Sequence, residues 1–129
     1  MRENALCFWR KVKSLFKELK EIENKDLMKA VKNSSGVVEF NPDGTIISIN
    51  KNFEEISGYS ESELLGSHHK MLITPKDYAE SDQLWKSLGR GIFKTGRVRR
   101  IHKDGSEFYL QASYNPIQNL EGKVIKVVK

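Results

Sequence analysis

Two groups of β-rich segments, at residues 36–50 and 92–128, constrain the fold of this chain more than any other feature. In the first group GVVEF and TIISIN flank the turn NPDG, in which proline presets φ and glycine supplies a positive φ. The second group contains GIFKTGRVRRIH, EFYLQASYNPI and KVIKVVK, separated by KDG and NLEG turns. Because a lone hairpin is marginally stable, both groups must share one sheet. The pattern predicts an α+β fold: a five-stranded antiparallel sheet with short helices on one face.

Short helical patterns fill residues 51–91 between the two β groups. KNFEEISG ends at Gly58, a typical helix stop, and Ser60 with Glu63 forms a capping box for the next segment. SHHKML is long enough for one turn, and Pro75 opens the longest helix of this region, KDYAESDQLWKSLGRG. A sheet covered by such helices encloses a hollow, which is a common place for a ligand.

Residues 1–32 have the periodicity of an amphipathic helix with a basic polar face, which Asn24 and Asp26 could interrupt. Its apolar residues recur at alternating steps of four and three: Phe8, Val12, Leu15, Leu19 and Ile22. This stripe can pack on the domain's own core, pair with a second chain or lie on a membrane surface. We favour pairing, with these five residues as the dimer contact. The helix is too short to dimerise well alone, so the globular domain must contribute.

Composition fits one domain with one appended element, which we place at residues 33–129 and 1–32. The chain has 129 residues, of which 38% are hydrophobic, and a net charge of +5. A single cysteine, Cys7, excludes an internal disulfide and a multi-cysteine zinc site. No apolar run approaches the roughly 20 residues of a membrane-spanning helix, and ALCFW is too short for a signal peptide. We therefore expect a cytoplasmic protein.

The run NPDGTIISINKNFEEISGYSESELLG resembles the signature of the PAS domain family, which links the second strand to the first helices. The residues that carry this resemblance are Asn50, Phe53, Gly58, Tyr59, Glu63, Leu64 and Gly66. The later run WKSLGRG to YNPI also fits, so the resemblance covers residues 33–129. The chain is most similar to PAS sensor domains of bacterial methyl-accepting chemotaxis transducers of the aerotaxis type. The matching positions are Gly66, His69, Trp85, YNPI at 114–117 and VVK at 127–129.

The resemblance implies a signal-sensing module that relays ligand or redox state through a homodimer to a downstream output domain. The dimer would use the N-terminal helix and the PAS sheet. KVIKVVK stops in mid-pattern, so we expect the natural chain to continue past Lys129. Two alternatives remain open. One is a scaffold that only dimerises without a cofactor, and the other is the PAS input of a histidine kinase or cyclic-di-GMP enzyme.

Four residues are candidates for the cofactor-binding cleft: Trp85, His69, His68 and Asn50. The two histidines are adjacent and point about 100° apart on a helix, so they cannot chelate one ion together. We expect no metal site unless haem b is bound, with His69 or His68 as the axial ligand. The resemblance places Trp85 over an FAD cleft, but ITPK at 73–76 replaces the Arg-His-Pro-Asp run of aerotaxis receptors. FAD, haem b and no cofactor all remain open.

Other functional classes find little support in the sequence. It has no GxSxG, phosphate-binding loop or HExxH motif, so we expect no enzyme activity. Asp77, Glu80 and Asp82 are one turn apart and fit a solvated helix face. RVRR at 97–100 alternates between two strand faces without aromatic residues, which favours a salt-bridged sheet surface over nucleic-acid binding. Blue-light PAS relatives need a cysteine in an early helix, and Cys7 lies outside the domain.

Overall fold

The computed structural model describes residues 5–129, apart from the side chain of Ser34. The chain divides into two compact units, Met1–Ser34 and Ser35–Lys129. The first unit contains helix α1 and the second contains every strand and the remaining helices. Within residues 5–129, no helix is long and apolar enough to cross a membrane.

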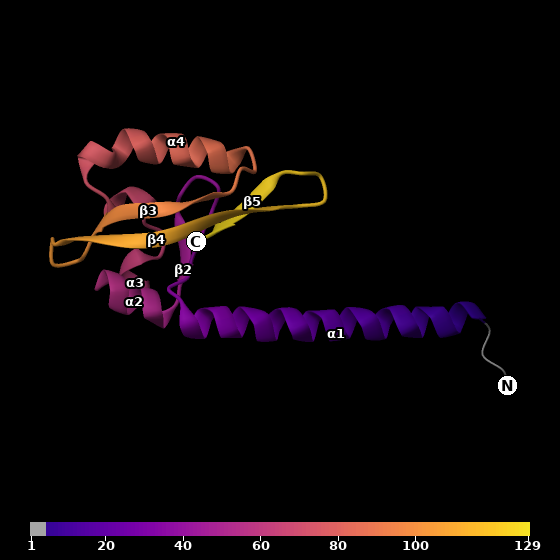
Figure 1. The fold of residues 1–129 in the computed structure, drawn as a ribbon. Coiled ribbons are helices and arrows are strands. Elements are labelled where there is room, and N and C mark those ends of the chain that lie inside the picture. Colours follow the sequence, from indigo (N-terminus) through magenta and orange to yellow (C-terminus); the bar gives the residue numbers. More distant parts are fainter. Residues whose placement is uncertain (1–4) are drawn as a thin grey trace. The chain divides into compact units, whose positions relative to one another are not determined.

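Helix α1 spans Ala5–Ser34 without a break (Figure 1), including Asn24 and Asp26, where the sequence permitted an interruption. Four apolar side chains of the predicted stripe are between 49% and 57% exposed, and Val12 is half-buried. These four are Phe8, Leu15, Leu19 and Ile22. The helix therefore presents a continuous apolar stripe that its own unit does not bury.

One antiparallel sheet with strand order β2-β1-β5-β4-β3 forms the second unit. The strands are β1 (Val38–Phe40), β2 (Ile46–Ile49), β3 (Lys94–Ile101), β4 (Glu107–Gln118) and β5 (Val124–Val128). Strand β5 lies between β1 and β4, so it joins the early hairpin to the late one (Figure 1). The predicted five-stranded antiparallel sheet is confirmed.

Short helical segments connect β2 to β3. They are α2 (Lys51–Ser57), α3 (Glu61–Leu64), the 3-10 turns η1 (His69–Leu72) and η2 (Pro75–Asp77), and α4 (Tyr78–Gly89). Gly58 ends α2 with φ +77°, and Ser60 and Glu63 form the reciprocal capping box that opens α3. Pro75 opens η2 directly before α4. The predicted stop at Gly58 and the capping box are confirmed, whereas Pro75 opens a separate 3-10 turn and the long helix begins only at Tyr78.

One hydrophobic core receives side chains from the helices and from the strands. Its buried members include Phe53 of α2, Leu64 of α3 and Leu88 of α4, together with Phe40 and Val127 of the sheet. Burying each such side chain contributes about 1.5–3 kcal/mol relative to leaving it in water. This shared core holds α4 against the sheet, and that packing defines the walls of the site described next.

Candidate functional site

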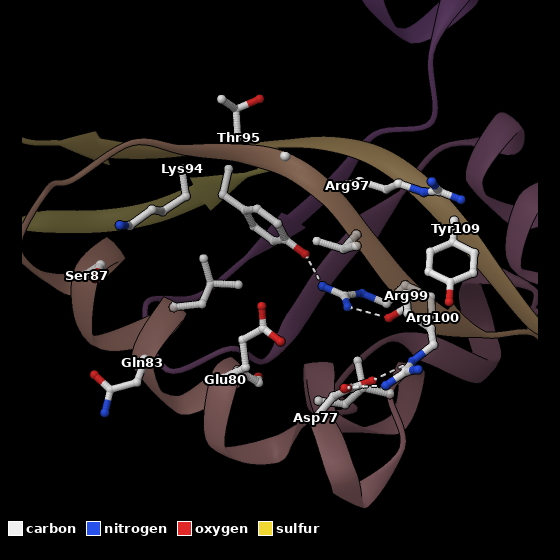
Figure 2. A pocket seen from close by; sticks show the side chains of 16 residues that line it. Asp77, Glu80, Gln83, Ser87, Lys94, Thr95, Arg97, Arg99, Arg100 and Tyr109 are labelled. Carbon is white, nitrogen blue, oxygen red and sulfur yellow. Dashed lines mark hydrogen bonds and ion pairs between the residues drawn. The ribbon is translucent and has the colours of Figure 1, made fainter.

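A cleft of about 510 Å³ is lined by residues of α4 and β3, and by Tyr109 and Tyr114 of β4 (Figure 2). Gly96 of β3 pairs with Ala112 of β4, so two small residues face each other at this part of the sheet. A side chain built at Gly96 would meet nothing within 4 Å. Because neither residue has a large side chain, space remains beneath α4. This space corresponds to the hollow that we expected between the sheet and its helical cover.

One end of the cleft carries a closed ion pair between β3 and η2. The guanidinium of Arg99 donates to both carboxylate oxygens of Asp77, at 3.1 and 2.7 Å. These bonds hold the pKa of Asp77 below its ordinary value and raise the pKa of Arg99. Arg97 lies over the ring of Tyr109, 4.4 Å from its centroid. Both arginines are therefore already engaged by other side chains.

Arg100 differs from its neighbours because its side chain is buried, with 6% exposed. One terminal nitrogen donates to the hydroxyl of Tyr114 at 2.5 Å, and the other to the carbonyl of Arg99 at 2.7 Å. Among residues 5–129, its Nε has no hydrogen-bond partner and no carboxylate pairs with it. Burial raises the pKa of Tyr114, so the phenol is neutral at physiological pH. The wall of the cleft thus contains a buried positive charge without a counter-ion.

Directly beside this wall lies a cluster of aromatic rings around His69. The imidazole is fully buried, and its ring centroid lies 5.5 Å from that of Trp85, 5.9 Å from Phe40 and 6.4 Å from Tyr114. Burial first, and then the positive charge of Arg100, lowers the pKa of His69 to about 2, so the ring is neutral. Its Nδ1 lies 3.1 Å from the hydroxyl of Ser81. In the described chain, Nε2 of His69 and Nε1 of Trp85 are buried without a hydrogen-bond partner.

His68 and Asn50 stabilise backbone rather than face the cleft. His68 Nε2 donates to the carbonyl of Asp43 at 2.8 Å, and its Nδ1 accepts from the amide of Lys70 at 3.1 Å. Asn50 Oδ1 accepts from the amides of Phe53 and Val37, so it caps α2 and ties it to β1.

The structure places none of the four predicted cleft residues among those that line this cleft, within the part of the chain it describes. Trp85 and His69 lie in the aromatic cluster, whereas His68 and Asn50 lie at helix starts. The arrangement does not fit haem iron at His69, because three aromatic rings enclose the imidazole. Residues 5–129 hold no cluster of three metal-binding side chains either.

Sequence reasoning missed Arg100 and Tyr114 as residues of a site. Tyr114 of β4 is buried. Arg100 follows Val98 by two positions, so a strand pattern puts both side chains on the same face. That spacing was the available signal that one arginine of RVRR points inward.

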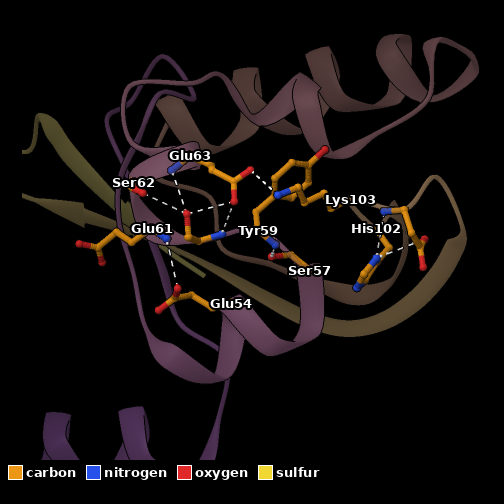
Figure 3. A network of polar contacts seen from close by, with 10 residues as sticks. Glu54, Ser57, Tyr59, Glu61, Ser62, Glu63, His102 and Lys103 are labelled. Carbon is orange, nitrogen blue, oxygen red and sulfur yellow. Dashed lines mark hydrogen bonds and ion pairs between the residues drawn. The ribbon is translucent and has the colours of Figure 1, made fainter.

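A second polar network, outside the cleft, joins the α2–α3 region to the β3–β4 turn (Figure 3). Lys103 donates to Glu63 at 2.7 Å, and the amide of Lys103 donates to the carbonyl of Ser57. The exposed side chain of Glu63 already belongs to the capping box. The side chains of Lys103 and Glu63 are exposed, so we assign this ion pair to the stability of the turn rather than to binding.

Known proteins match this chain over most of its length. A family model described as the PAS fold matches residues 46–129. The biofilm dispersion protein BdlA of Pseudomonas aeruginosa is 37% identical over 111 residues, covering 84% of this chain and 27% of that protein. The bacterioopsin transcriptional activator of Halobacterium salinarum is 33% identical over 84 residues, covering 64% of this chain and 12% of that protein. The chain therefore spans about a quarter or less of these curated relatives.

Solved structures show the same fold. A PAS domain from Colwellia psychrerythraea superposes with a TM-score of 0.71 at 26% identity, covering 81% of this chain and 90% of that one. A light-oxygen-voltage domain, studied with a flavin analogue, superposes with a TM-score of 0.69 at 29% identity and covers 80% of each chain. The sheet order, the capped helices and the family match agree, and this chain belongs to the PAS-fold family.

Proposed function

We propose that this chain is the sensory domain of a cytoplasmic bacterial signalling protein, of the kind found in chemotaxis transducers. One observation carries the proposal: a cleft whose wall contains a buried, unpaired arginine in a domain of the PAS family. A buried charge without a partner costs several kcal/mol, as a rough estimate, so it is retained where a ligand repays that cost. The domain itself is non-catalytic and passes its state to an output domain in the same protein.

The proposed relay runs through the sheet. A ligand in the cleft alters the contact between Arg100 and Tyr114, which joins β3 to β4. Strand β4 pairs with β5, and β5 pairs with β1. The segment before β1 is held by Asn50, whose amide donates to the carbonyl of Ser35 at 2.6 Å. A shift between two populations of the sheet therefore reaches the residues that directly follow α1.

Helix α1 is the output end of this relay and pairs with the same helix of a second copy. The support is its apolar stripe, in which Phe8, Leu15, Leu19 and Ile22 are exposed. Burying such a stripe in a dimer removes apolar surface from water at about 25 cal/mol per Å². In such a dimer, the paired α1 helices respond together to the state of both clefts.

The dimer contact is tested by sedimentation velocity of the double variant Leu15→Glu with Leu19→Glu. The matched control is Arg10→Gln with Lys17→Gln, which lowers the net charge equally on the opposite face of α1. We expect the leucine variant to be monomeric and the control to remain dimeric. A dimer that survives both pairs of changes contradicts pairing through the stripe.

The relay is tested by hydrogen exchange of the full chain. Tyr114→Phe keeps the buried ring and removes the hydroxyl that accepts from Arg100. We expect altered protection of the amides at residues 35–40 and in α1. Tyr78→Phe, at a partly exposed tyrosine outside the cleft lining, is the control and should leave these amides unchanged. Identical hydrogen exchange in both variants and the parent would contradict the relay.

A flavin is the second candidate ligand. The observation that favours it is the light-oxygen-voltage domain at 29% identity, whose study names a flavin analogue. In this chain Leu84 and Val98 would supply apolar contacts to a flavin ring, and Gln83 is a polar residue of the same lining. A bound flavin would supply redox chemistry, whereas Cys7 lies in the other unit of the chain. Flavin absorption in protein from riboflavin-supplied cells supports this candidate, and a spectrum of tryptophan and tyrosine alone contradicts it.

A further inference from the structure

The charges that line the cleft do not balance. Six lining residues carry charge, and four of them are basic: Lys94, Arg97, Arg99 and Arg100, against Asp77 and Glu80. Asp77 is fully engaged by Arg99, as described above. Glu80 is an exposed residue, and no ion pair joins it to Arg100 within residues 5–129. The lining therefore carries an excess of positive charge, and Arg100 is its most buried charged residue.

At Arg100, two hydrogen-bond donors have no acceptor among the described residues. Arg100 Nε is buried without a partner in the described chain. The hydroxyl oxygen of Tyr114 accepts from Arg100, so its own proton is available for a second bond. Arg100 belongs to β3 and Tyr114 to β4, so both donors come from the sheet (Figure 2 shows Arg100). Two adjacent donors, one of them charged, match the two oxygens of a carboxylate.

Beside the polar residues of α4, part of the lining is apolar. Ile73, Leu84 and Val98 line the same cleft as Arg100. Ile73 is buried, and Leu84 and Val98 pack against the core. A ligand that fills this space must therefore combine an apolar body with a group that accepts hydrogen bonds and carries negative charge.

We propose that the cleft binds a small organic carboxylate with an apolar body, oriented with its carboxylate on Arg100 and Tyr114. This inference rests on the proposed function, because it names the class of molecule that the sensory site takes. Arg100 supplies the charge, Tyr114 supplies a neutral donor, and Leu84 and Val98 contact the apolar part. Glu80 at the same cleft opposes the ligand's charge and so limits its affinity.

The test is isothermal titration calorimetry of the full chain with two matched pairs of probes. Benzoate is compared with benzamide, and hexanoate with hexanamide, so that only the charge of the polar end differs within a pair. We expect at least one carboxylate to bind about tenfold or more tightly than its amide, because a hydrogen bond to a charged group is the stronger kind. Equal binding within both pairs, or no binding of any probe, overturns the proposal.

Variants then locate the binding site. Arg100→Gln should abolish the preference for the carboxylate, whereas Arg90→Gln, the same change at an exposed position outside the lining, should keep it. Because Arg100 is buried and its replacement endangers folding, Tyr114→Phe is the second variant and should weaken the carboxylate but not the amide. Glu80→Gln should strengthen carboxylate binding. A preference that survives in Tyr114→Phe and in a folded Arg100→Gln overturns the assignment of these residues.

The calorimetric test of the ligand class and the hydrogen-exchange test of the relay can fail independently of each other. If a carboxylate binds but hydrogen exchange in α1 does not change, the ligand class is supported and the relay is contradicted. Altered exchange in Tyr114→Phe, with no carboxylate binding to the parent, retains the sensory function and removes the ligand class.

Discussion

The imidazole Nδ1 of His69 lies 3.1 Å from the hydroxyl of Ser81, and both side chains are buried. This contact joins η1 to the buried face of α4. Trp85, one turn further along α4, packs on the same imidazole. The pair therefore fixes the helix that forms one wall of the cleft, and Ser81 itself belongs to the cleft lining.

Removing the hydroxyl in Ser81→Ala should lower the free energy of unfolding by about 1–3 kcal/mol, because His69 then keeps a buried ring nitrogen without a partner. Urea unfolding measures the change. Ser87→Ala, on the same helix and without this contact, is the matched control and should cost less. Equal losses in the two variants would show that the bond to His69 contributes nothing.

Acid should destabilise this domain through His69. Its pKa is about 2 in the folded protein and near 6.5 when unfolded, so the unfolded chain binds the extra proton between these values. Stability from this residue is present above pH 6.5 and falls as the pH drops below it. Between pH 7 and pH 5 we expect a loss of about 2 kcal/mol from this histidine.

The measurement is the free energy of unfolding in urea at pH 7 and pH 5, for the parent and for His69→Asn. Asparagine does not titrate in this range, so the variant should lose less stability between the two pH values, whatever its stability at pH 7. The difference between the two slopes isolates His69 from the other titrating groups. A variant with the parent's slope would contradict a neutral buried imidazole.

Gly58→Ala and Gly66→Ala separate backbone strain from a steric clash. Both glycines have positive φ, at +77° and +81°, so alanine strains each by about 1–2 kcal/mol. A Cβ at Gly58 would also clash with the ring of His102, whereas at Gly66 it would meet nothing within 4 Å. We expect thermal or urea unfolding to show a larger loss for Gly58→Ala. In a His102→Ala background the two losses should become equal, and a persisting gap would point to another cause.

An absorption spectrum tests the enclosure of His69. For protein from cells supplied with a haem precursor, we expect no Soret band that depends on this residue, because Phe40, Trp85 and Tyr114 surround the ring. The comparison is the parent, His69→Ala and His68→Ala. A Soret band that disappears only in His69→Ala would show that the aromatic cluster opens to admit haem.

Local rules predicted the parts of the fold that depend on a few neighbouring residues. Gly58, Ser60 and Glu63 act within one or two turns of chain, so their helix stop and capping box were readable directly. The five strands followed from alternation and turn residues, and a single sheet followed from the weakness of isolated hairpins.

The candidate site was less accessible because it depends on contacts across the sheet. RVRR was interpreted as a salt-bridged surface, and this holds for Arg99 with Asp77. It fails for Arg100, which is buried and donates to the hydroxyl of Tyr114 on the neighbouring strand. The resemblance directed attention to Trp85 and His69, which share the core with that wall but do not face the cleft.

The strand order also sets when this domain assembles during synthesis. Strand β5 lies between β1 and β4, and Val128 pairs with Glu39 from the far end of the unit. Before β5 leaves the ribosome, β1–β2 and β3–β4 are separate hairpins, and each is marginal in water. Pairing residues so distant in sequence is also slow, because the intervening chain must first close into a loop. The nascent domain thus stays unassembled, with its apolar strands in need of protection, until the final strand is inserted at the centre of the sheet.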